Sequence, residues 1–507
     1  MKKKYVRWTL WTIASPFILF VILCILIYLP PIQNFLVDKA AVYASETTGM
    51  NISVGRISLS FPLNLVVTDV DAASPHNDTL LSVRRLQVNV QLLPLLKKQV
   101  EVDGISLQGA TVNSNDLIHG MKLNGTLGEL FISSHGVALD PETAIVNKVL
   151  LKDTDLSLCL NDTAAADTAA SDTTYWKIIL QDIDLQNVSF ALDMPLDSLS
   201  LAASLDNAIL RDGLIDLHKS AYSLQTFRIK NGRVRYDSGK PLAADSLPSG
   251  LDPSHIALTD IGVKLDSLYY EGRNMKAIIS QFVLKERSGV EIVSATGRMV
   301  SNDKVLRVPS LKLETRDSYL ELNAAMDWNA LDFKGEGLMS ARLMADIGKP
   351  DVVRFMGRMD EKFVRQYPSE PLRIRTGIDG DLNKLKLTTL TAELPGALGL
   401  FARGELTHLT DSLLRGGDIT LEAETKDLKF VSTLAEGIEI PYGTRLEGKF
   451  TMAGAKMGTD LLLMQPEAQA WLRPSTIPIT VYNDSISVRM ISRWNGGPSV
   501  CQIRLVA

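Results

Sequence analysis

Residues 51–61 read NISVGRISLSF, and apolar side chains recur in this stretch at every second position. The alternation slips by one position at Gly55-Arg56 and then resumes. A period of two is that of a β-strand, because successive side chains of a strand point to opposite faces. The stretch therefore predicts a strand with one polar face and one apolar face. The apolar members are Ile52, Val54, Ile57, Leu59 and Phe61.

The same alternation recurs along most of the chain and predicts a mainly β protein. Asp, Asn and Gly interrupt the alternating runs, and we expect them to form turns between short strands. A loose repeat, in which Asp follows an apolar residue at the second position, begins at Val67, Leu151, Leu180 and Leu258. We expect this Asp to close a side-chain turn onto its own backbone and to start the next strand. Further runs contain Leu86, Val88 and Val90, Val102, Ile105 and Leu107, Phe227 and Ile229, Val234 and Tyr236, Leu311 and Leu313, and Leu320 and Leu322.

Helices are predicted to be few and short. Apolar residues spaced by three and four predict an amphipathic helix over residues 31–49, which either packs on the first strand or lies on a membrane surface. Pro94–Leu96 fits a single turn. Ser340–Ala345 and Pro350–Phe355 are the best helix candidates in the rest of the chain.

Residues 1–30 differ from everything that follows. Four basic residues precede the uncharged stretch Trp8–Leu29, which as a helix is about 33 Å long and long enough to cross a bilayer core. No small-residue cleavage site follows it. We therefore expect a single-pass signal anchor in the inner (plasma) membrane. The basic residues place the N-terminus in the cytoplasm and the bulk of the chain in the periplasm.

The remaining residues carry 49 basic and 58 acidic side chains, a net charge of −9. This mild acidity argues against a nucleic-acid partner, whose binding needs clustered Lys and Arg. Residues 161–174 are low-complexity Ala, Asp and Thr, which predicts a loop within a β-rich region at residues 50–463. Residues 464–507 are rich in Pro, Trp and Arg, and we interpret them as an atypical tail produced by a truncation or a shifted reading frame.

The sequence contains no recognisable pattern for catalysis. Its six His and three Cys show no metal-ligand spacing, and there is no nucleophile elbow or phosphate-binding loop. Carboxylates are abundant, but they fall where turns are expected. We therefore predict a non-enzymatic protein with no catalytic, metal or cofactor-binding residues and no cofactor.

Several segments between residues 28 and 113 resemble the N-terminal part of the AsmA/TamB superfamily, most of all the TamB-like translocation and assembly proteins of Bacteroidetes. The residues that carry the resemblance are Tyr28-Leu-Pro-Pro-Ile-Gln, Thr48-Gly-Met-Asn-Ile-Ser-Val-Gly-Arg, Asp78-Thr-Leu-Leu, Leu92-Leu-Pro-Leu-Leu-Lys and Val100-Glu-Val-Asp-Gly-Ile-Ser-Leu. The resemblance implies an elongated, curved, groove-like β-sheet behind the membrane anchor. It also implies phospholipid transport to the outer membrane, or outer-membrane protein assembly and secretion with a BamA-like partner. In that family the diagnostic domain lies at the far C-terminus of much longer chains, and we expect these 507 residues to lack it.

The sequence leaves open whether the apolar faces form a dry core or a groove lined with phospholipid acyl chains. The residues expected to face lipid are Ile57, Leu59, Leu86, Val88, Val90, Val102, Ile105 and Leu107. Two alternatives remain. One is an anchored scaffold that binds unfolded outer-membrane protein strands by edge pairing, and the other is a periplasmic enzyme with a dispersed site.

Overall fold

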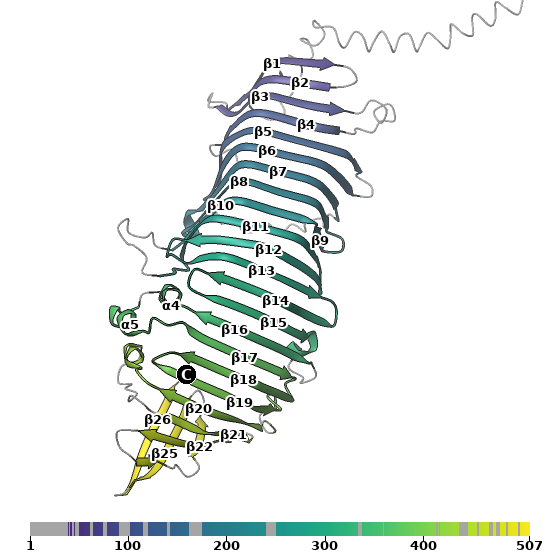
Figure 1. Ribbon diagram of the computed structural model, residues 1–507. Coiled ribbons are helices and arrows are strands. Elements are labelled where there is room, and N and C mark those ends of the chain that lie inside the picture. The colour runs from purple at the N-terminus through teal and green to yellow at the C-terminus, as the bar shows by residue number, and fades with distance from the viewer. Residues whose placement is uncertain are drawn as a thin grey trace, which may run out of the picture. The chain divides into compact units, whose positions relative to one another are not determined.

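The computed structural model is mainly β, with curved multi-stranded sheets and few helices (Figure 1). It divides into two units, residues 1–242 and 243–507. The structure describes residues 50–60, 64–74, 79–90, 102–114, 120–138, 142–161, 175–239, 250–332, 337–357, 359–411, 414, 416–434, 445–453, 456–465, 470–472, 477–482, 485–494 and 497–506, with the isolated helical positions 39, 41, 42 and 45.

The described part of the first unit is built almost entirely from long strands, several of which bend visibly along their length (Figure 1). A single 3-10 turn, η1 (Pro195–Asp197), follows the seventh strand. The strands are β1 (Asn51–Ser60), β2 (Asn64–Ala73), β3 (Thr79–Val90), β4 (Val102–Asn113), β5 (Met121–Ala138), β6 (Thr143–Leu160), β7 (Lys177–Met194), β8 (Leu199–Asp216), β9 (Ala221–Leu224) and β10 (Thr226–Ser238).

Strands β1 to β8 pair in chain order, and both β9 and β10 pair with β8. All of these pairs are antiparallel except β6 with β7, in which Thr143 stands beside Lys177 and the two strands run in the same direction. The pairing gives the first unit one sheet, so each strand contributes alternate residues to the same two faces.

One residue in each of nine strands lies at the same level of this sheet, and we call these nine residues the bend row. At this level the apolar alternation slips by one position in every strand, as in β3, where Val83 is followed by Leu86. The slip keeps the same face apolar on both sides of the bend. The bend row is Gly55, Asp69, Arg84, Gly109, Gly128, Asp153, Asn187, Asp206 and Asn231.

Five residues of the bend row have left-handed backbone, with φ between 48° and 63°. They lie on β2, β4, β6, β7 and β10, which run in one direction, whereas β1, β3, β5 and β8 run in the other. Asp, Asn and Gly tolerate this conformation best. Glycine also relieves crowding, because a Cβ on Gly55 would lie 2.9 Å from Cβ of Asp69, and one on Gly128 would lie 2.8 Å from Cβ of Asp153.

The strand predicted at residues 51–61 and its slip at Gly55-Arg56 are confirmed over residues 51–60 by β1 and its burial pattern, and Phe61 lies outside the described residues. The turns expected at several Asp and Asn residues are wrong. Phe227 and Val234 belong to one strand, β10, and Asn231 bends that strand instead of ending it. Asp69 and Asp153 of the loose repeat likewise lie inside β2 and β6. A left-handed residue turns the chain locally while its neighbours keep the ladder pairing.

The second unit is also a strand meander, with short helices between some strands (Figure 1). Its strands are β11 (His255–Glu271), β12 (Asn274–Glu286), β13 (Glu291–Ser301), β14 (Val305–Thr315), β15 (Tyr319–Asp327), β16 (Met339–Ile347), β17 (Leu372–Gly380), β18 (Lys384–Leu394), β19 (Leu398–Thr407), β20 (Gly416–Thr425), β21 (Arg445–Ala453), β22 (Lys456–Gln465), β23 (Ala470–Leu472), β24 (Ile477–Tyr482), β25 (Ser485–Trp494) and β26 (Gly497–Val506). Its helices are η2 (Trp328–Asp332), α4 (Lys349–Met356), α5 (Glu361–Gln366) and η3 (Lys429–Thr433).

Strands β11 to β22 pair antiparallel in chain order, with register shifts in several pairs. The predicted helix at Pro350–Phe355 is confirmed by α4. The one predicted at Ser340–Ala345 is wrong, because these residues form β16 between β15 and β17. Ala, Leu, Met and Arg favour helices intrinsically, but pairing on both sides overrides that preference.

The most deeply buried apolar cluster of the described residues lies where α5 and η3 meet. Phe363 is 1% exposed, and its ring centroid lies 5.4 Å from that of Tyr367 and 5.8 Å from that of Phe430. Leu372, at the start of β17, and Leu398, at the start of β19, pack against the cluster. The two short helices therefore cover the end of the sheet's apolar face.

Several predictions fall outside the described residues. The anchor at residues 1–30, most of the helix at 31–49, the single turn at Pro94–Leu96 and the loop residues 162–174 lie there. No helix among the described residues is long and apolar enough to cross a bilayer. The tail at 464–507 contains the backbone strands β23 to β26, and its interpretation as truncated or frameshifted stays a prediction.

Asn187, at φ 52° in the bend row, tests the need for left-handed backbone. We expect Asn187→Val to lower the free energy of unfolding by about 1–2 kcal/mol, because a β-branched residue resists this conformation. Asn187→Gly should lose less. Gln186→Val, the control at the preceding residue, should be nearly neutral. Chemical denaturation of the full chain, followed by circular dichroism, measures all three, and equal losses for the two Val variants would contradict the assignment.

Phe363 tests the cluster between α5 and η3. We expect Phe363→Ala to cost about 3–5 kcal/mol of unfolding free energy, because it leaves a cavity among packed rings. Phe355→Ala makes the same chemical change on α4, where the side chain is 56% exposed, and should stay within about 0.5 kcal/mol. The same denaturation assay compares them. Similar stabilities for the two variants would show that the cluster contributes little.

Candidate functional site

The candidate site is the apolar face of the first unit, whose members follow from the register. Residues directly opposite in neighbouring strands share a face. Two rows flank the bend row on this face. The leucine row consists of Ile57, Val67, Leu86, Leu107, Leu130, Leu151, Leu185, Ala208 and Ile229. The valine row consists of Val54, Val70, Val83, Ala110, Leu127, Thr154, Val188, Leu205 and Gly232.

A further row lies beyond each of these, and we call the two rim rows. The rim row beyond the leucine row is Leu59, Leu65, Val88, Ile105, Ile132, Val149, Ile183, Leu210 and Phe227. The rim row beyond the valine row is Ile52, Ala72, Leu81, Val112, Gly125, Leu156, Phe190, Ala203 and Val234.

The structure places the eight sequence-predicted residues together on strands β1, β3 and β4. Ile57, Leu86 and Leu107 belong to the leucine row, and Leu59, Val88 and Ile105 belong to the adjoining rim row. Val90 and Val102 stand opposite each other in the next pair along β3 and β4. Whether these residues touch lipid stays a prediction, but the register brings them to one continuous patch.

Sequence reasoning missed most of this face, which continues across β2, β5 to β8 and β10. Leu151 and Leu185, for example, extend the leucine row beyond β4. The signal was present in the sequence as the same alternation on both sides of an Asp, Asn or Gly. Interpreting those residues as turns broke each run into two short strands and hid the second half of the face.

All thirty-six residues of the four rows are uncharged. Most are partly exposed, and Leu81 and Phe190 are each 37% exposed. Among the residues that the structure describes in the first unit, no second sheet or helical layer packs on this face. Large apolar surfaces that remain accessible usually bind another apolar body.

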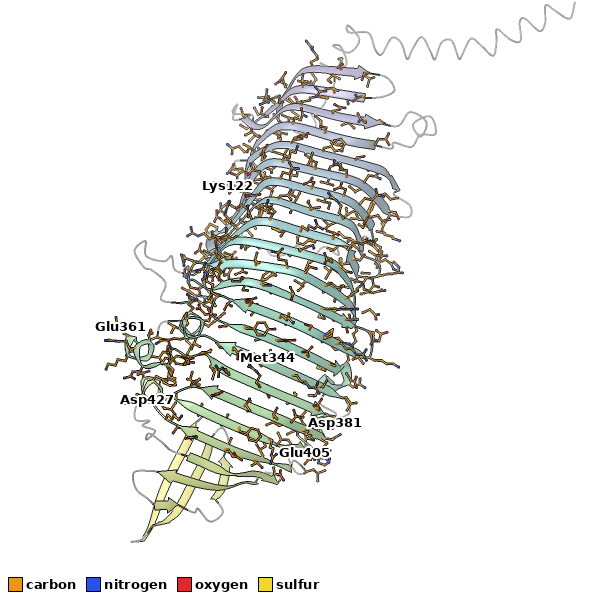
Figure 2. All side chains as sticks on the ribbon, in the orientation of Figure 1. Lys122, Met344, Glu361, Asp381, Glu405 and Asp427 are labelled. Carbon is orange, nitrogen blue, oxygen red and sulfur yellow. The ribbon has the colours of Figure 1, made fainter. Side chains whose placement is uncertain are left out.

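The opposite face of the same sheet is polar. Lys152 Nζ lies 3.7 Å from Glu129 Oε2, and Arg233 Nη2 lies 3.4 Å from Asp206 Oδ1. The bend row adds side-chain hydrogen bonds, because Nδ2 of Asn187 donates to Oδ1 of Asp153 at 2.8 Å. Figure 2 shows side chains projecting from both faces of the sheet. These exposed polar groups favour contact with water on this face, whereas the other face favours contact with apolar groups.

The second unit repeats this division of faces. Leu311, Leu322 and Leu343 stand opposite one another on β14 to β16. On the other face, Arg375 Nη2 lies 2.8 Å from Asp346 Oδ1. Met344, labelled in Figure 2, lies on that polar side, one residue from Leu343. An amphipathic sheet is therefore common to both units.

The most deeply buried carboxylate among the described residues of the second unit holds helix α4 in place. Asp351 is 1% exposed, and its Oδ2 accepts hydrogen bonds from Ser318 Oγ at 2.6 Å and from the Thr315 hydroxyl. Nη1 of Arg354 lies 3.1 Å from the other oxygen, Oδ1. These bonds fasten α4 to the turn between β14 and β15. The described residues contain no group of three or more His, Cys, Asp or Glu able to hold a metal ion.

No protein-family model matches this chain, and a search of curated proteins finds no similar one.

Proposed function

We propose that this protein is a non-enzymatic lipid conduit, anchored in the inner membrane by residues 1–30, which holds phospholipid acyl chains on the apolar face of its first unit. The observation that carries the proposal is that face itself, with four uncharged rows that cross nine strands and no covering layer among the described residues. Each methylene that leaves water for such a surface gains about 0.8 kcal/mol. A continuous apolar path therefore lowers the barrier for a lipid that crosses an aqueous compartment.

The resemblance of residues 28–113 to TamB-like proteins extends the proposal. It suggests transport through the periplasm toward the outer membrane, and a BamA-like outer-membrane protein as a partner. Under this proposal, the anchor fixes one end of the path at the donor membrane. The polar face, with its ion pairs, keeps the sheet soluble while the apolar face is occupied.

Val88 and Gln87 provide a matched test, because they are neighbours on opposite faces of β3. The full chain is purified in mild detergent, and phospholipid released on unfolding is measured by mass spectrometry. We expect Val88→Glu to lower bound lipid about tenfold, since a carboxylate on the face displaces some two methylenes. Gln87→Glu adds the same charge to the polar face and should retain lipid.

Wild-type protein free of lipid would refute the proposal, as would undiminished lipid in a folded Val88→Glu variant. Recovery of unfolded outer-membrane barrel precursors in place of lipid would instead support the strand-binding scaffold.

A further inference from the structure

The polar face of the second unit contains a cleft that spans strands β18 to β20. Its volume is about 330 Å³, and the side chains that line it on this face belong to Glu393, Phe401, Glu422 and Glu424, with Gly399 at its floor. Small-molecule sites start at about this size, roughly 300 Å³. An adjoining pocket of about 170 Å³ shares Glu393, Gly399 and Glu424 and reaches the turn between β18 and β19. The cleft therefore has room for a small chemical group.

Gly399 opens the cleft, and the sheet itself does not require a glycine there. It lies inside β19 without left-handed backbone, and a Cβ at this position would meet no atom within 4 Å. Gly404 on the same strand differs, because its Cβ would collide with the carbonyl oxygen of Asp418. A glycine weakens the interior of a strand and often marks a place where a ligand approaches the backbone closely. Gly399 therefore points to an occupant of the cleft.

The charges on either side of Gly399 alternate across the strands. The register places one row on β17 to β21 that consists of Arg373, Glu393, Gly399, Glu424 and Arg445. Arg373 Nη1 lies 3.6 Å from Glu393 Oε2. The order of charges along the row is positive, negative, gap, negative, positive. A positive group in the gap completes this alternation.

Distance decides which charges control the gap. Neighbouring strands are about 4.8 Å apart, so each glutamate of the row is one spacing from Gly399, whereas each arginine is two spacings away, about 9.6 Å. Salt screens exposed charges that are more than about 8 Å apart at physiological ionic strength. Lys426 lines only the adjoining pocket, and Glu422 adds a third carboxylate to the cleft. The potential in the gap is therefore negative.

Phe401 supplies an aromatic wall to the cleft. It occupies the next position of β19 on the same face as Gly399. The guanidinium carbon of Arg403 lies 5.9 Å from the centroid of the Phe401 ring, so this ring already attracts one cation. Aromatic rings attract ammonium groups, and the alkyl stem of such a group packs on apolar surface. A ring gives no ligand atom to a metal ion, and the described residues contain no group of three or more His, Cys, Asp or Glu able to hold one.

We propose that the cleft binds an ammonium group on an alkyl stem, with the nitrogen in the gap between Glu393 and Glu424 and the methylenes against Phe401. Such a group is carried by a lysine side chain of a partner protein or by a free polyamine. The site lies on the polar face of the second unit, so it does not depend on the proposed lipid path.

Saturation-transfer difference NMR on the full chain in mild detergent tests the site with three probes. They are Nα-acetyl-lysine amide, spermidine and Nα-acetyl-norleucine amide, which keeps the alkyl stem and lacks the ammonium group. We expect transfer to the first two and none to the third. Tighter binding of spermidine would identify a free polyamine as the ligand, and tighter binding of the lysine derivative would identify a lysine side chain. No transfer to either amine, or equal transfer to the norleucine derivative, would overturn the proposal.

Three variants locate the binding, with circular dichroism as the check of folding. Gly399→Val fills the cleft, where a Cβ meets no atom within 4 Å, and should abolish transfer. Glu424→Gln should weaken binding about threefold, since an exposed ion pair is worth about that factor. Glu405→Gln is the matched control and should bind like wild type, because Glu405, labelled in Figure 2, lies near the other end of β19 and pairs with Lys384 at 3.2 Å.

Equal binding by wild-type protein and folded Gly399→Val would show that the amines bind elsewhere. If Gly399→Val does not fold, the two Gln variants decide the matter, and equal binding by both of them would overturn the site.

Discussion

The structure of the first unit depends on one geometrical constraint, which is the two-residue period of a β-strand. Where a sheet with one apolar face is bent by one extra residue in every strand, the apolar alternation must slip by one position at that level; otherwise half of the side chains change faces. The bend row satisfies this constraint with Asp, Asn, Gly and one Arg, and five of its residues have left-handed backbone. A continuous apolar face and a polar opposite face follow together from it.

Much of this fold could be predicted from the sequence, because alternation is a local signal. The strand at residues 51–60 and its slip at Gly55 could both be predicted. The bends at Asn231 and Asp153 could not, because the same residue types form turns and bends. Only the pairing of neighbouring strands distinguishes the two outcomes. The helix prediction at Ser340–Ala345 was wrong for a related reason. These residues favour a helix intrinsically, but strands on both sides pair with them and make them a strand.

The candidate site was predictable only in part. The eight residues identified from sequence lie together because β1, β3 and β4 come close in the sheet and carry clear alternation. The rows beyond β4 required the register, which no local pattern contains. The burial of Val83 and Thr154, at 6% and 2% exposure, also depends on the pairing of neighbouring strands beside the bend row, which no local pattern contains.

The relation between left-handed backbone and strand direction in the bend row limits how such a sheet can gain or lose strands. The left-handed residues of the bend row lie only on strands that run one way, so a duplicated hairpin adds one strand of each kind and extends the bend unaltered. A single inserted strand reverses the direction of everything after it, unless it pairs in parallel with its neighbour. The β6–β7 pair has that arrangement, with Asp153 and Asn187 both left-handed and hydrogen-bonded side by side. The parallel β6–β7 pair therefore allows the sheet to contain an odd number of strands and still keep its bend.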